Sequence, residues 1–267
     1  MKTAIRNTLG GLALLMAGLS PAAHAAGVLR IAVNPIYPPL EFRDPVTDTL
    51  TGFDIDFGTA LATRMGMTVE WVETSFPQMI PSVQSGRTDI ILSGFSDLPK
   101  RRSLLNFIPY LWSGAQVLVR ADDSVATAQD LCGKTVATSR ATSFPLMIED
   151  WSQKNCTAKN LPAMSFYPSE SGADARIQLL QGRVAAMVQG RETVGYFMKI
   201  TNNAFRQLGS PLSHMTLAIA FPKNAHPLEE RVQNAFAQMK GDGSYATLLE
   251  KWSLLKDAIE PLEGASP

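Results

Sequence analysis

Short apolar runs alternate with longer amphipathic stretches in the first part of the chain, which is the pattern of strands followed by helices. Glycines close both helical stretches. The expected elements are a strand at 29–33, a helix at 53–65, a strand at 68–72, a helix at 76–85 and a strand at 90–92. This order predicts an α/β fold with a mostly parallel sheet covered by helices on both faces.

A second unit of the same kind follows, and a last group of elements ends the chain. The second unit is expected as a strand at 134–138, helices at 143–153 and 173–181, and a strand at 184–188. The last group is expected as a strand at 216–221 and helices at 227–240 and 245–252. The helix at 227–240 places Val232, Phe236 and Met239 on one face, so it should pack against a core.

The segment after the strand at 90–92 carries a chemical signal. Ser93, Gly94 and Ser96 are small residues that let a ligand approach the backbone. Pro99 suits the first position of a helix, which places Arg101 in the opening turn. A cation there opposes the helix dipole, and its planar guanidinium can hold a carboxylate through two parallel bonds. The segment indicates either an anion site or a solvated basic helix start.

The first 25 residues have the three parts of a secretory signal peptide. Lys2 and Arg6 precede an apolar run at 9–19, and small residues at 23–25 form a cleavage site. The run is too short to span a bilayer, and no cysteine follows it to carry a lipid. We therefore expect a mature chain that begins at Ala26 and is exported in soluble form to the periplasm.

The composition is that of a globular protein, 45% hydrophobic and 18% charged. Without Lys2 and Arg6, the 24 Lys and Arg fall to 22 against 24 Asp and Glu, so nothing basic enough for nucleic acid remains. Cys132 and Cys156 lie in one region of an exported chain, which favours a disulfide. The histidines of the mature chain lack the spacing of a metal cluster, so no metal or other cofactor is expected.

Five segments, taken in order, resemble the signature of the periplasmic amino-acid-binding proteins of ABC importers, which are solute-binding proteins of family 3. The segments are 36–42, 50–56, 80–89, 92–101 and 241–245. The resemblance covers nearly the whole mature chain. It implies the type II periplasmic binding protein fold, with two Rossmann-like lobes, a two-strand hinge and a ligand cleft between the lobes.

The same resemblance implies domain boundaries and partners. Lobe 1 would comprise 26–112 and 216–267, and lobe 2 would comprise 113–215. The chain would cross between the lobes near 111–115 and 213–217, and ligand binding should close them as a hinge. The implied function is a monomeric, non-catalytic binding component that delivers an amino acid or related small carboxylate to a permease of the inner membrane.

In lobe 1 the resemblance implies six ligand contacts. They are Asn34, Tyr37, Phe76, Gly94, Ser96 and Arg101. Arg101 would hold the ligand carboxylate beside the hydroxyl of Ser96. Tyr37 and Phe76 would enclose the ligand side chain, and the backbone of Gly94 would meet its amine.

In lobe 2 the resemblance implies contacts from one loop and one strand end. They are Ser139, Arg140, Thr142, Ser143 and Gly190. The amides of the loop would meet the carboxylate from the second side, with Thr142 as the N-cap of the following helix.

Two departures from the family pattern bear on the ligand. Gly190 stands where an aspartate usually pairs with the α-ammonium, and Glu192 could replace that acid from two positions away. Arg140 and Arg191 should face or flank the cleft, where relatives usually carry neutral or acidic residues. If either arginine points inward, a ligand with a second negative charge, or one without an amine, is favoured. The implied ligand is accordingly a polar or acidic amino acid or a related carboxylate.

Two other functions stay open. The first is a periplasmic enzyme similar to cyclohexadienyl dehydratases, which needs a protonated acid in the cleft; Glu170 and Glu192 are the candidates in lobe 2. The second is a sensor or accessory protein that presents the cleft to a partner other than a transporter.

Overall fold

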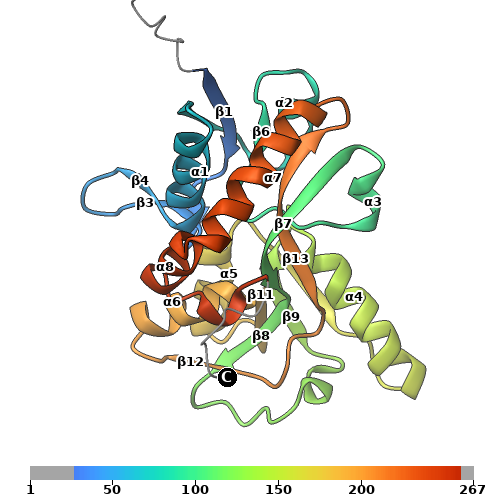
Figure 1. Cartoon of the computed structure of the whole chain (residues 1–267). Coiled ribbons are helices and arrows are strands. Elements are labelled where there is room, and N and C mark those ends of the chain that lie inside the picture. Colours follow the sequence, from blue (N-terminus) through green and yellow to red (C-terminus); the bar gives the residue numbers. More distant parts are fainter. Residues whose placement is uncertain (1–26, 260–267) are drawn as a thin grey trace, which may run out of the picture.

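The computed structural model describes residues 27–259, so the predicted signal peptide lies outside the described residues. Two five-stranded sheets each form the centre of an α/β lobe, with lobe 1 in the upper part and lobe 2 in the lower part of the view (Figure 1). The predicted two-lobed α/β fold is confirmed. Within 27–259 no helix combines the length and the apolar character that a membrane crossing requires.

The sheet of lobe 1 has the strand order β5-β1-β6-β13-β7. Its strands are β1 (Val28–Val33), β5 (Thr68–Glu73), β6 (Ile90–Ile91), β7 (Leu105–Ser113) and β13 (Met215–Pro222). The first three strands of this order are parallel, as predicted, whereas β13 is antiparallel to both of its neighbours. The sheet is therefore mixed rather than mostly parallel, because β13 returns from lobe 2 and runs against β6 and β7.

The sheet of lobe 2 has the order β10-β9-β11-β8-β12. Its strands are β8 (Ala115–Arg120), β9 (Thr135–Ser139), β10 (Ser165–Ser169), β11 (Ala186–Gly190) and β12 (Phe205–Gln207). Here β10, β9 and β11 are parallel, and β8 and β12 complete the sheet in antiparallel pairings. The carboxyl ends of the parallel strands in each sheet are the usual place for a ligand in an open α/β sheet.

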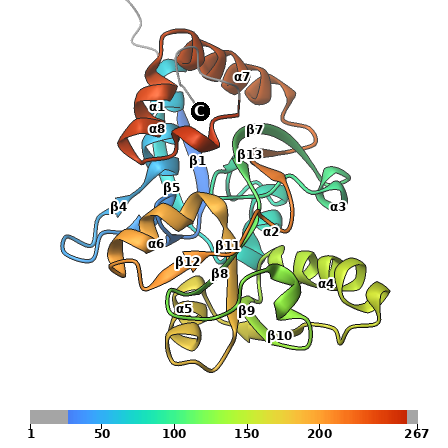
Figure 2. The ribbon, with the colours of Figure 1, turned by 90° about the horizontal axis from the view of Figure 1, so that it is seen from below.

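Helices cover both faces of each sheet. Lobe 1 holds α1 (Phe53–Arg64), α2 (Met79–Gln84), α3 (Pro99–Arg102), α7 (His226–Gly241) and α8 (Ser244–Lys251). Lobe 2 holds α4 (Phe144–Asn155), α5 (Gly172–Leu180) and α6 (Val194–Ile200). Figure 2 shows α4 and α5 on either side of β9. Each sheet face has its own apolar cluster, and α7 buries Val232, Phe236 and Met239 as its periodicity predicted.

Two predicted helices differ from the structure. The helix expected at 76–85 divides into the 3₁₀ turn η1 (Phe76–Gln78) and α2, with Pro77 inside the turn. The helix that begins at Pro99 is a single turn that ends at Arg102. A helix of one turn has little macrodipole, so the argument from its opposition to the charge of Arg101 does not hold.

A small antiparallel sheet outside the two main ones carries part of the cavity wall. It consists of β2 (Ile36–Tyr37), β3 (Glu41–Arg43) and β4 (Leu50–Thr51) in the order β2-β3-β4. The pairing of Tyr37 with Glu41 places these two side chains next to each other at the edge of lobe 1. The periodicity of the sequence did not reveal this sheet, because its strands have only two or three residues.

The chain passes between the sheets at two adjacent places. The first crossing is Gly114, between β7 and β8, and the second lies between β12 and β13. Ala115 N donates to Ser213 Oγ at 3.2 Å, and Leu212 N donates to Ala115 O at 2.8 Å. A β-carbon at Gly114 would overlap the carbonyl oxygen of Ser213, so the two crossings can lie this close only with glycine at 114.

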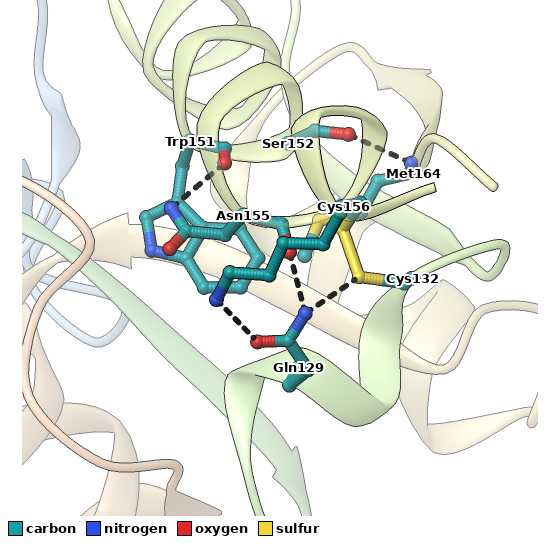
Figure 3. The surroundings of a disulfide bond; sticks show 8 residues. Gln129, Cys132, Trp151, Ser152, Asn155, Cys156 and Met164 are labelled. Carbon is teal, nitrogen blue, oxygen red and sulfur yellow. Dashed lines mark hydrogen bonds between the residues drawn. A yellow bond between two sulfur atoms is a disulfide. The ribbon is translucent and has the colours of Figure 1, made fainter. Parts of the chain in front are cut away.

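The predicted disulfide between Cys132 and Cys156 is confirmed, with a Cα–Cα distance of 5.6 Å. It joins the segment after the 3₁₀ turn η2 (Ala128–Leu131) to the end of α4. The amide of Gln129 donates to the carbonyl of Asn155 beside the sulfur atoms (Figure 3). On the other side of the helix end, Met164 N donates to Ser152 Oγ at 2.9 Å (Figure 3). The disulfide therefore fixes the C-terminal end of α4, whereas the cavity lies at the N-terminal end of the same helix.

Candidate functional site: a cavity between the lobes

A cavity of about 340 Å³ lies between the lobes and is lined by residues from both of them. Nine of the eleven predicted ligand contacts line it. They are Asn34, Tyr37, Phe76, Gly94, Ser96, Ser139, Arg140, Thr142 and Ser143. Across the cavity, Ser96 Oγ of lobe 1 and Ser143 Oγ of lobe 2 lie 3.5 Å apart. Segments more than a hundred residues apart in the sequence thus converge on one small space.

Arg101 lies behind the cavity wall rather than in it. Its guanidinium carbon is 4.0 Å from the ring centroid of Phe95 and 5.8 Å from that of Phe76. Its Nη1 donates to the carbonyl of Ser96 at 2.8 Å. Burial lowers the pKa of Arg101 to about 10, so the side chain stays charged at neutral pH. Among residues 27–259 no carboxylate forms an ion pair with it, although both Phe76 and Ser96 line the cavity.

The loop of lobe 2 that lines the cavity leads into α4. The N-cap of α4 is Ser143 rather than Thr142, and its side chain makes no capping bond. Thr142 Oγ1 instead donates to the carbonyl of Ser139 at 2.8 Å and accepts from Phe144 N at 3.3 Å. The prediction of Thr142 as N-cap was therefore wrong by one position. The hydroxyl of Thr142 is nevertheless used to shape the loop, which leaves Ser143 Oγ turned toward Ser96.

Gly190 does not line the cavity, and the geometry explains why no aspartate stands there. A β-carbon at 190 would overlap Glu192 Oε1 and Tyr37 Oη. Tyr37 Oη donates to Glu192 Oε1 at 2.7 Å, and Ser113 Oγ donates to Glu192 Oε2 at 2.6 Å. The carboxyl group of Glu192 therefore occupies the space of a side chain at 190. It joins lobe 2 to Tyr37 of lobe 1 instead of facing the cavity.

Burial raises the pKa of Glu192 to about 7, with the hydrogen bonds from Ser113 and Tyr37 acting in the opposite direction. Burial, followed by the nearby Glu192 charge, raises the pKa of Tyr37 well above its usual range. The phenol of Tyr37 is thus a neutral donor committed to Glu192. The hydroxyl hydrogen of Tyr37 is therefore not available to a ligand, although Tyr37 lines the cavity.

Two buried acids lie at the lobe-1 side of the cavity. Glu41 Oε1 accepts from Ser93 Oγ at 2.8 Å, and Asp54 Oδ2 accepts from Gly94 N at 2.8 Å and from Tyr110 Oη at 2.9 Å. The two carboxyl groups lie close enough for the charge of Asp54 to act on Glu41. Burial, and then the charge of Asp54, raises the pKa of Glu41 well above its usual range, so Glu41 is the acid of the two that keeps a proton.

The burial of Glu41 and Asp54 leaves two oxygen atoms without a donor, which is costly if both groups are ionised. Glu41 Oε2 and Asp54 Oδ1 are buried and have no donor from another residue within 27–259. A proton on Glu41 lowers the cost of burying the two carboxyl groups near each other. Burial raises the pKa of Asp54 to about 6, opposed by its bonds from Gly94 and Tyr110. Glu41 therefore lines the cavity as a neutral group, and the pair fixes the Gly94 loop.

The two arginines that suggested an acidic ligand are both neutralised. Arg140 lines the cavity, but its Nη2 lies 2.7 Å from Glu170 Oε2. Arg191 points away from the cavity, with Nε 2.7 Å from Asp257 Oδ1 and Nη2 donating to the carbonyl of Lys256 at 3.0 Å. These pairs remove the argument that an extra cation in the cleft demands a second negative charge on the ligand.

The two acids nominated for an enzymatic reaction are placed differently. Glu170 lines the cavity, but it is exposed and paired with Arg140. Glu192 is buried, but it faces Tyr37 and Ser113 instead of the cavity. Neither combines burial with access to a ligand.

Several lining residues were not predicted from the sequence. They include Glu41, Thr138, Phe144 and Gln189. Thr138 and Gln189 are polar residues within a residue or two of the carboxyl ends of the parallel strands β9 and β11, and this position is a general signal for a ligand contact. No comparable signal marks Glu41, because its burial depends on the fold of the small sheet.

Two sheets with a cavity between them and two adjacent crossings define a two-lobed binding protein that can enclose a small molecule. Comparison with known families matches residues 29–255 to the bacterial extracellular solute-binding proteins, family 3. The chain belongs to this family.

Individual relatives agree with this assignment. The L-cystine-binding protein TcyJ of Escherichia coli (strain K12) is 28% identical over 238 residues, which cover 88% of this chain and 86% of that protein. The structure of an ancestral arginine-binding protein bound to arginine is similar with a TM-score of 0.76 at 28% identity, covering 86% of this chain and 99% of that one.

A third relative is related to an enzyme. It is the ancestral amino acid-binding protein AncCDT-1, described as a precursor of cyclohexadienyl dehydratase. The similarity has a TM-score of 0.72 at 32% identity and covers 85% of this chain and 95% of that one. That protein is itself described as amino-acid-binding.

Proposed function

We propose that this protein is the periplasmic substrate-binding component of an ABC transporter, which binds an amino acid or a related small carboxylate and delivers it to a membrane permease. The observation that carries the proposal is the cavity, which nine of the eleven predicted ligand contacts line from both lobes. Membership of a family of solute-binding proteins and the cystine- and arginine-binding relatives support it. A polar amino acid fits better than a strictly acidic one, because Arg140 and Arg191 are both paired.

In the proposed binding mode, the carboxylate of the ligand and the remainder of the ligand contact different residues. Arg101, with the backbone amides of the loop at 139–143, holds the carboxylate, and the rings of Tyr37 and Phe76 contact the remainder. The guanidinium of Arg101 has no competing carboxylate within 27–259 and reaches Ser96 at the cavity wall. A ligand carboxylate would give this buried cation a charged partner.

The proposed lobes are 26–112 with 216–267, and 113–215, and they would close about crossings near 111–115 and 213–217. The hydrogen bonds that tie Ala115 to residues 212 and 213 support a shared hinge, because the two crossings must then move together. We propose export by the signal peptide at 1–25 and action as a monomer.

Calorimetry of unliganded protein tests the function. The probes are L-arginine, L-cystine, L-histidine, L-glutamate, succinate and a 2-keto acid, and binding of at least one amino acid is expected. If none of the probes binds, the proposal fails. Turnover of prephenate or arogenate would establish the enzymatic alternative in its place.

A further inference from the structure

One segment of lobe 2 contacts lobe 1 outside the cavity. It comprises the 3₁₀ turn η4 (Arg191–Thr193) and the first residues of α6, which together form the interlobe segment, 191–196. We propose that the interlobe segment holds the two lobes together through contacts between protein side chains, so that Glu192 and Arg191 are positioning residues for ligand binding although neither lines the cavity. This inference rests on the proposed binding function and names residues that act on the affinity without contacting the ligand.

Glu192 provides the buried part of this contact. Its Oε1 accepts from Tyr37 Oη of lobe 1 at 2.7 Å, and its Oε2 accepts from Ser113 Oγ at 2.6 Å. The backbone beside it is attached to the first crossing, because Arg191 N donates to the carbonyl of Gly114 at 3.0 Å. A hydrogen bond between hydroxyl and carboxyl groups needs a donor–acceptor distance of about 3 Å or less. The bond from Tyr37 therefore persists only while the angle between the lobes stays close to the one in this structure.

Two further contacts join the interlobe segment to lobe 1. Arg191 Nε lies 2.7 Å from Asp257 Oδ1, and Arg191 Nη2 donates to the carbonyl of Lys256 at 3.0 Å. The two side chains of this ion pair are only 30% and 9% exposed, so salt and water screen it less than a fully exposed pair. The ring of Tyr196 lies 5.7 Å from the ring of Phe42 in β3. A buried carboxyl group, an ion pair and a ring contact thus act together on one short segment.

Asp257 is a fixed partner, because the segment that carries it is attached to the end of β7. Ala258 forms a β-bridge with Leu111, and Trp112 Nε1 donates to the carbonyl of Ile259 at 3.2 Å. These contacts place Asp257 on lobe 1, close to the first crossing. The ion pair therefore connects lobe 2 to a segment that lobe 1 holds in place.

The protonation of Glu192 distinguishes this role from a purely structural one. Titratable groups of four other elements interact with Glu192, namely Tyr37, Glu41, Tyr110 and Asp257. These groups are phenols and acids, so a charge on Glu192 gains no cationic partner among them. Burial raises the pKa of Glu192 to about 7, and separation of the lobes would admit water and return the pKa toward its ordinary value. Opening of the lobes therefore becomes easier as the pH rises through about 7.

Small-angle X-ray scattering of the protein without ligand, at about pH 6 and about pH 8, measures lobe opening as the radius of gyration. The variants are Glu192→Gln, Glu192→Ala and Arg191→Ala. The matched controls are Glu250→Gln, which changes an exposed acid in α8, and Arg102→Ala, which removes an arginine whose partner Asp97 lies in the same lobe. Calorimetry at about pH 6 with L-arginine, L-cystine, L-histidine and L-glutamate measures affinity.

Glu192→Ala and Arg191→Ala should have a larger radius of gyration than the wild type at about pH 6 and should bind amino acids about ten-fold more weakly, whereas the controls should match the wild type. The radius of the wild type should rise between about pH 6 and about pH 8, because the ratio of open to closed molecules increases by about ten-fold. Glu192→Gln should remain compact at both pH values, since an amide keeps both hydrogen bonds and does not titrate.

Equal radii for the wild type, Glu192→Ala and Arg191→Ala at both pH values would overturn the inference, and so would unchanged amino-acid affinity in both alanine variants. A rise with pH that Glu192→Gln shares with the wild type would also overturn it, because another group would then control the opening. If Glu192→Ala does not fold, Arg191→Ala and Glu192→Gln decide. The scattering uses no ligand, so a wild type that binds none of the amino acids would refute the proposed function, and the radii would still decide whether the interlobe segment holds the lobes together.

Discussion

The ionisation of Glu192 should be visible in the stability of the whole protein. Its side chain is 3% exposed, and burial raises its pKa to about 7. In the unfolded chain a glutamate titrates near about 4.3. Between these values the folded state keeps a proton that the unfolded state has released. The contribution of Glu192 is therefore fully present below the unfolded pKa and is lost as the pH rises through about 7.

The magnitude follows from the gap between the two pKa values. At about 1.4 kcal/mol per pH unit, the gap corresponds to roughly 4 kcal/mol of unfolding free energy over the whole titration. The change Glu192→Gln removes the titration and keeps the hydrogen bonds, because an amide can accept from one hydroxyl and donate to the other. The free energy of unfolding of the wild type should thus fall by roughly 2 to 3 kcal/mol relative to the variant between about pH 5 and about pH 8.

Urea unfolding of both proteins across this pH range measures the difference. Glu250→Gln is the matched control, because Glu250 is an exposed acid in α8 and its replacement leaves Glu192 in place. A difference between wild type and Glu192→Gln that stays constant from about pH 5 to about pH 8 would refute the reasoning. It would mean that Glu192 has the same proton affinity in the folded and unfolded states.

Three further predictions concern the cavity and the disulfide of lobe 2. Arg101→Ala should weaken amino-acid binding by roughly 2 to 4 kcal/mol in calorimetry, since the carboxylate loses its charged partner. The control Arg102→Ala removes an exposed arginine that pairs with Asp97 and should leave the affinity unchanged. Unchanged affinity in Arg101→Ala would contradict the proposed role of Arg101. Gly190→Ala should lower the unfolding free energy by about 1 to 3 kcal/mol, because its β-carbon overlaps Glu192. Adding Glu192→Ala should recover part of this loss. If the losses of the two single variants simply add in the double variant, the clash is contradicted. Replacing both cysteines by serine should cost roughly 3 kcal/mol in urea unfolding, and an unchanged midpoint would show that the bond does not stabilise lobe 2.

The sequence predicted those parts of the fold that depend on periodicity. Five of the six parallel strands and the long helices α1, α4 and α7 were located to within about two residues, because each has an apolar run or a helical period. The sixth parallel strand, β10, was not predicted. The strands β2 to β4 are too short for any period to show. The antiparallel course of β13 was also missed, since it depends on where the chain returns from lobe 2.

The sequence also predicted part of the candidate site, namely the residues that lie in family motifs. Residues in family motifs, such as Tyr37 and Ser143, were placed at the cavity, because the resemblance carries their position. The pairing of Arg140 with Glu170 and of Arg191 with Asp257 could not be predicted, since the partners are brought together only by the tertiary fold. The same holds for Glu192, whose role as a link between the lobes depends on Tyr37, 155 residues away.

These pairings change what the cavity can recognise by charge. The lining cation Arg140 is balanced by Glu170, and the lining acid Glu41 is held neutral by Asp54. The guanidinium of Arg101, just behind the wall, has no ion-pair partner among residues 27–259, and neither has Asp54, whose pKa of about 6 leaves it ionised at neutral pH. In the proposed binding mode, Arg101 attracts the carboxylate of the ligand, and the rings of Tyr37 and Phe76 contact the remainder. Shape and hydrogen bonding should then decide between amino acids.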